Sequence, residues 1–134
     1  MTDLFIPYTQ ALALKELGFD EPCWAWWHIE DCDTRFCYSE QRSPIINSRE
    51  TEVVGLPTYS QAFKWFREKY DLSFYIFQCY HKGVVMDYHP VIHLKGEEEP
   101  INDTLLDEHP TYEEAELACI IKLIEIVKTL KIED

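Results

Sequence analysis

The residues best suited to metal chemistry are Asp87, His89 and His93. Their positions share one parity, so on a strand the three side chains point to the same side. A carboxylate and imidazoles are common zinc ligands. Along a regular strand, however, His89 and His93 lie about 13 Å apart, too far to bind one ion. Only a break of the strand at Pro90 would bring them together, so we expect no metal and no cofactor.

Cysteine and histidine also occur together in two other places. Cys79 and His81 are i, i+2 neighbours, which share a face of a strand but form no hydrogen-bonded pair, and no third orienting residue is evident. His28, Cys32 and Cys37 surround a turn at a spacing that fits no zinc knuckle, and buried thiols are the expected role. Without a glycine-rich phosphate loop either, the sequence predicts no enzyme and no catalytic residue.

Three helices are predicted from their first residues. Thr58 precedes Gln61 by three positions and Thr111 precedes Glu114 by the same interval, which is the spacing of a capping box. Gly18 is a suitable end for the first helix. The predicted helices run from Pro7 to Gly18, from 58 to 70 and from 111 to 131.

Four strands are predicted between these helices, as two hairpins. The segments are 23–29 with 34–38, and 73–80 with 84–94, the second pair joined at Lys82-Gly83. Pro90 marks its strand as an edge strand or breaks it, and residues 39–56 and 95–109 are expected to be loops. The predicted fold is α+β, a two-layer sandwich of three helices on one four-stranded antiparallel sheet, in the order α-β-β-α-β-β-α.

The chain's 134 residues suit a single domain spanning 1–134. A Tyr-x-[Gln/Glu]-Ala signature recurs at Tyr8, Tyr59 and Tyr112. It indicates a possible helix-plus-hairpin repeat, 7–39 and 57–94, closed by the helix 111–131, although common helix-start residues would give the same pattern.

Aromatic side chains occupy both faces of the predicted strands. Trp24 and Trp26 lie opposite Ala25 and its neighbours, and Tyr75 and Phe77 lie opposite Phe74. These four residues, Trp24, Trp26, Tyr75 and Phe77, are our candidates for a binding surface, and an aromatic core is the alternative. Because both faces are apolar, we expect cover from a second subunit, giving a homo-oligomer such as a dimer, or from residues 39–56.

The charge of the chain excludes some partners. Its formal net charge is −13, and residues 97–134 alone hold three Lys and twelve acidic residues. Such a surface repels the phosphates of nucleic acid.

No apolar run is long enough to cross a membrane, and no signal peptide is evident, so we expect a cytoplasmic protein. The odd number of cysteines, five, fits reduced thiols.

Three segments resemble a group of small uncharacterised proteins of phages, prophages and mobile elements of gut bacteria. The middle one, Pro57-Thr58 followed by Trp65-Phe66-Arg67-Glu68, is the most specific; the others are Ile6 to Cys23 and Thr111 to Ala115. The resemblance implies work in a host cytoplasm and brings no activity or cofactor with it.

These observations favour a non-enzymatic binding protein that acts on a host protein or a defence system through protein–protein contacts. The alternative is a protein that binds or sequesters a small ligand such as a nucleotide, in an aromatic pocket at a subunit interface.

Overall fold

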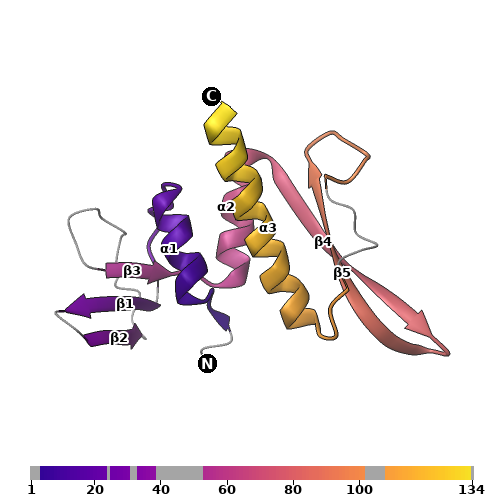
Figure 1. Ribbon diagram of the computed structural model, residues 1–134, viewed down its shortest axis with the longest axis horizontal. Coiled ribbons are helices and arrows are strands. Elements are labelled where there is room, and N and C mark those ends of the chain that lie inside the picture. The colour runs from indigo at the N-terminus through magenta and orange to yellow at the C-terminus, as the bar shows by residue number, and fades with distance from the viewer. Residues whose placement is uncertain (1–3, 24, 31–32, 39–52, 102–107, 134) are drawn as a thin grey trace. The chain divides into compact units, whose positions relative to one another are not determined.

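A computed structural model describes residues 4–23, 25–30, 33–38, 53–101 and 108–133 (Figure 1). By its internal contacts the chain forms two compact units, residues 1–62 and 63–134, which are described separately below. The expectations of a single domain and of an internal repeat stay predictions.

The first unit begins with helix α1, Tyr8–Glu16. Pro7 precedes it, and Gly18 ends it with φ at 101°. The amide of Phe19 donates to the carbonyl of Leu14, and the amide of Gly18 donates to that of Lys15. These two hydrogen bonds form a Schellman motif, in which glycine supplies the residue with left-handed backbone conformation. The predicted end of the first helix is therefore confirmed.

A three-stranded antiparallel sheet completes the first unit. It consists of β1 (Ala25–Glu30), β2 (Asp33–Tyr38) and β3 (Val53–Leu56), in the order β2-β1-β3. The first predicted hairpin is confirmed, but β3 lies where we expected only loop. Because β3 has four residues, one of them Gly55, it is too short to show a strand periodicity.

Helices α2, Tyr59–Tyr70, and α3, Tyr112–Glu133, begin where their caps predict. The Thr58 hydroxyl accepts a hydrogen bond from the amide of Gln61, and Thr111 does the same for Glu114, each at 3.1 Å. The side chain of Gln61 does not bond back to the backbone amide of Thr58, as a complete capping box requires. It donates instead to the carbonyl of Pro22, 2.8 Å away, so only half of that capping box forms.

The second unit contains the long hairpin of β4, Leu72–His81, and β5, Val84–Leu94. Lys82 and Gly83 connect the strands with φ at 52° and 80°, as a two-residue type I′ turn requires. The register shifts between Cys79 and Tyr80, so Met86 is the extra residue of a β-bulge.

Helices cover one face of this hairpin. The ring of Phe63 on α2 stacks on Phe74 of β4 with centroids 3.7 Å apart. Tyr112 at the start of α3 meets the edge of Tyr88 on β5. Trp65 and Phe66 of α2 are buried, and α3 buries one stripe along its length. The buried residues of that stripe are Ala115, Cys119, Ile120, Leu123, Ile124 and Val127.

The α+β class and the three helices are thus confirmed. A single four-stranded sheet is not confirmed, because the two hairpins lie in separate sheets and β3 extends the first. The element order is α-β-β-β-α-β-β-α. Alternation predicts strands and hairpins but not which hairpins share a ladder. In the described part of the chain no helix is both long and apolar enough to cross a membrane.

Candidate functional site

Two aromatic side chains are exposed on the face of the long hairpin that α2 and α3 leave free. Tyr75 and Phe77 of β4 are each 51% exposed. The Tyr75 ring stacks on His93 with centroids 5.6 Å apart, and the Phe77 ring lies 6.2 Å from His89. Neighbouring imidazoles on β5 therefore hold both rings in place while half of each faces solvent.

The backbone of β4 has an open outer edge. Tyr88 of β5 exchanges both backbone hydrogen bonds with His109, on the side of β5 away from β4. Its cross-strand partner Gln78 therefore belongs to a non-hydrogen-bonded pair and directs its own N–H and C=O away from β5. The same alternation applies to Ile76 and Phe74. Among the described residues, β5 is the only strand that pairs with β4.

The outer edge of β5 is occupied instead. Besides the Tyr88–His109 pair, the amide of Ile101 donates to the carbonyl of Ile92 at 2.7 Å. Pro90 lies between these two residues, so its missing N–H faces the outer edge and costs no bond to β4. The strand runs through Pro90 without a break. The predicted break is therefore wrong, and β5 is the end strand of its sheet, with single-residue partners along its outer side.

Next to Phe77 three ligand-bearing side chains converge. The Cys79 sulfur, an Asp87 oxygen and a His89 nitrogen all lie within 4.8 Å of one another. His89 is 4% exposed, and its Nε2 lies 3.1 Å from Asp87 Oδ1.

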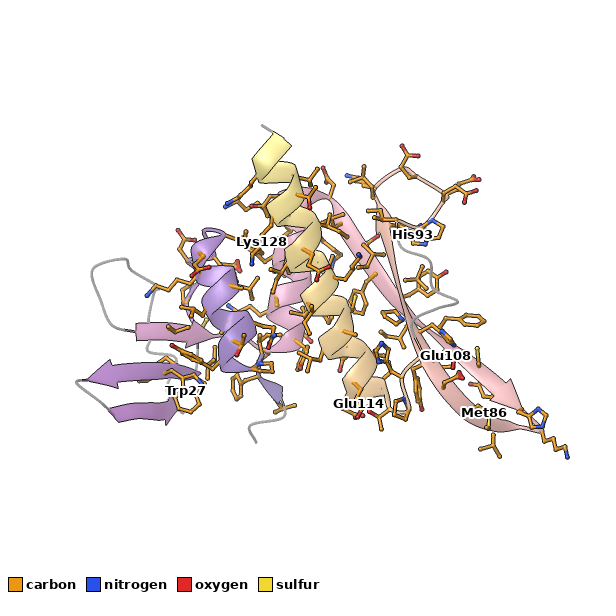
Figure 2. All side chains as sticks on the ribbon, viewed as in Figure 1. Trp27, Met86, His93, Glu108, Glu114 and Lys128 are labelled. Carbon is orange, nitrogen blue, oxygen red and sulfur yellow. The ribbon has the colours of Figure 1, made fainter. Side chains whose placement is uncertain are left out.

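The carboxylate of Glu108 lies near enough to Cys79 to act on its thiol, but it does not belong to the group of three. Because His109 pairs with Tyr88 in an antiparallel bridge, Glu108 falls opposite His89. Figure 2 shows Glu108 beside the hairpin. Burial, and then the charges of Asp87 and Glu108, raise the pKa of the Cys79 thiol.

This arrangement does not activate a nucleophile. A cysteine nucleophile needs an imidazole next to its sulfur, oriented by a third group. Here the Nε2 of His89 lies 3.1 Å from Asp87 Oδ1 and so has the carboxylate as its partner, and the pKa of the thiol is raised where an active thiol has it lowered. The geometry offers sulfur, nitrogen and oxygen donors around one point.

The structure brings together only part of the set Asp87, His89 and His93 that the sequence offered as metal candidates. Asp87 and His89 are neighbours, whereas His93 stacks on Tyr75 further along the unbroken strand. The third member is Cys79, which the sequence pattern missed for a specific reason. A regular hairpin turning at Lys82-Gly83 pairs Cys79 with Met86, and only the bulge moves Cys79 opposite Asp87.

The tryptophan candidates belong to the first unit. Trp26 is half-buried opposite Gly55 on β3. The rings of its neighbour Trp27 and of Tyr8 meet edge to face, with centroids 5.8 Å apart. Trp24 lies outside the described residues. Trp65 is buried at 5% exposure, which agrees with the aromatic-core alternative at that position.

A surface pocket lies where α2 meets β4. Its lining includes Arg67 and Lys95 together with Asp71 and Glu97, and His93. The two cations and the two anions balance, and no Trp, Tyr or Phe lines it. It therefore lacks the Trp or Tyr ring that the nucleotide alternative calls for.

In comparisons with known proteins, no family model, no curated protein and no solved structure matches this chain.

Proposed function

We propose that the protein is a non-enzymatic binding protein that takes an extended segment of a partner protein along β4. The observation that carries this proposal is the pair Tyr75 and Phe77, half exposed on a ten-residue strand whose outer edge is open among the described residues. Strand addition uses such edges: backbone hydrogen bonds supply affinity, and alternate side chains supply specificity.

The chemistry of the surface defines the partner. Tyr75 and Phe77 lie two positions apart, so a strand beside β4 meets both rings with alternate side chains of its own. Tyr80, Val84 and Met86 are exposed further along the same hairpin, at 65%, 62% and 58%. An extended segment with apolar residues at alternate positions fits this surface, because aromatic side chains give the largest contributions to protein interfaces.

The resemblance of three segments to phage and mobile-element proteins favours a host protein as that partner, in the bacterial cytoplasm. A second copy of the chain would offer β4 as the extended segment, which gives a homodimer. The two occupants differ in what they predict for the isolated protein, because only the second makes it a dimer without a partner.

The test starts from a random peptide library displayed on phage and selected against the full-length protein. We expect the selected peptides to carry apolar residues at alternate positions. Ile76→Pro removes one outward N–H from β4 without removing a bond to β5, as Pro90 does on the opposite strand. We expect it to weaken peptide binding at least tenfold, and Phe77→Ser to do the same, whereas Ile76→Val retains binding.

Three outcomes would count against this assignment. Selected peptides that bind the Ile76→Pro and Phe77→Ser variants as well as the parent would show that β4 is not the contact. A dimer by light scattering that both substitutions dissociate would assign the edge to a second copy instead. A shift in melting temperature with nucleotides would favour the small-ligand alternative.

A further inference from the structure

We propose that Cys79, Asp87 and His89 bind one divalent transition-metal ion of the zinc type, and that Glu108, which lies outside this cluster of three, turns toward the ion as a fourth ligand. This inference goes beyond the proposed function and does not depend on it. The three residues come from both strands of the hairpin, and Glu108 comes from the segment that pairs with the outer edge of β5.

The geometry is close to that of a tetrahedral site. With metal–ligand distances of about 2.0 Å to oxygen and nitrogen and about 2.3 Å to sulfur, ligand atoms lie about 3.3–3.6 Å apart. The donor atoms of the three residues already lie within 4.8 Å of one another, and His89 Nε2 and Asp87 Oδ1 are 3.1 Å apart. Small side-chain rotations therefore suffice to bind an ion.

The donor types select the metal. Thiolate and imidazole favour zinc and its neighbours over magnesium and calcium, which prefer sites made of oxygen alone. On binding, the Cys79 thiol gives its proton to solvent as the sulfur–metal bond forms. Asp87 and Glu108 contribute negative charge that a cation offsets.

The surroundings also suit a bound ion. The imidazole of His89 is almost fully buried, and the ring of Phe77 packs beside it. A buried imidazole keeps a fixed orientation, and an apolar neighbour limits the access of water to the ion. Asp87 is 26% exposed, which leaves a path for the ion to enter.

The experiment uses cobalt as a spectroscopic probe for the full-length protein, freed of metal with a chelator. We expect one Co²⁺ per chain to give the visible absorption of tetrahedral cobalt and a thiolate-to-cobalt charge-transfer band, both removed by Zn²⁺. Cys79→Ser should abolish the charge-transfer band. Asp87→Asn should weaken Co²⁺ binding at least tenfold.

His93→Gln is the matched control, because it removes an imidazole of the same face that does not belong to the cluster. We expect it to keep the cobalt spectrum. Because His89 is buried, its replacement would also disturb packing. The test therefore rests on Cys79 and Asp87, which are less buried. The proposal is wrong if stoichiometric Co²⁺ gives no charge-transfer band, or if the band survives Cys79→Ser.

Discussion

Lys82 adopts a backbone conformation that costs free energy for any residue with a Cβ. Its φ is 52°, and with Gly83 at 80° it forms the turn between β4 and β5. A type I′ turn needs positive φ at both central residues, for which Asn-Gly is the preferred pair. Lysine in this place retains a strain that asparagine largely relieves, since its short side chain bonds locally.

We predict that Lys82→Asn raises the free energy of unfolding by roughly 1 kcal/mol. Urea unfolding followed by circular dichroism measures the change. Lys82→Ala is the control, because it removes the same charge and keeps a Cβ at the same φ, so it should bring no gain. An equal gain in both variants would mean that loss of the lysine charge, and not relief of backbone strain, causes the increase in stability.

The candidate site shows how far residue patterns alone could predict chemistry. Parity along one strand correctly placed Asp87 beside His89 and Tyr75 beside Phe77 on one face. It could not add Cys79, because a one-residue bulge decides which residue of β4 stands opposite Asp87. No local preference in the sequence identifies that bulge, since it depends on the pairing of two strands.

Elements were predictable where their ends carry chemical signals. The caps at Thr58 and Thr111 and the left-handed Gly18 lie within the segments that define the three helices. The strand β3 carries no such signal, and its four residues gain their structure only by pairing with β1. The division into two sheets likewise depends on long-range pairing, which alternation does not encode.

Helix α3 contains a carboxylate, that of Glu116, whose surroundings disfavour its charged form. Burial, and then the nearby Glu113, raise the pKa of Glu116 above its ordinary value of 4.5. A raised pKa in the folded state means that folding disfavours the carboxylate form. Glu116 therefore lowers stability above that pKa, and the loss disappears as the pH falls and the group is protonated.

We predict that Glu116→Gln raises the free energy of unfolding at pH 7, with a gain that shrinks to zero below about pH 4. Urea unfolding at several pH values measures the difference from the parent. Glu98→Gln, on an exposed turn after β5, serves as the control and should change little at any pH. A gain that grows toward acid pH would contradict the assigned cause.

At the scale of the whole molecule, the formal net charge of −13 is the dominant electrostatic fact. Like charges repel more strongly in the compact state than in the unfolded chain. The screening length falls from about 30 Å at 0.01 M salt to about 10 Å at 0.1 M. Added salt should therefore relieve repulsion between carboxylates that are not in contact.

We predict that raising NaCl across this range stabilises the protein by roughly 1 kcal/mol, about 4 °C in Tm for a chain of this size. Thermal unfolding followed by circular dichroism measures the shift. An uncharged solute at the same osmotic strength does not screen charges and should not reproduce this shift. A Tm that falls with added NaCl would mean that attractive pairs such as Lys64–Glu68 outweigh the repulsion.

The two sides of the long hairpin differ in a way that limits assembly. On the β5 side, Pro90 lacks an N–H, and Tyr88 and Ile92 already have backbone partners. On the β4 side, among the described residues, no strand follows. Among the described residues, this hairpin therefore has one edge open for pairing, along β4. If a strand adds beside β4, the described part of β5 offers no second open edge, so association through this hairpin would stop at a finite complex and would not propagate into a fibre.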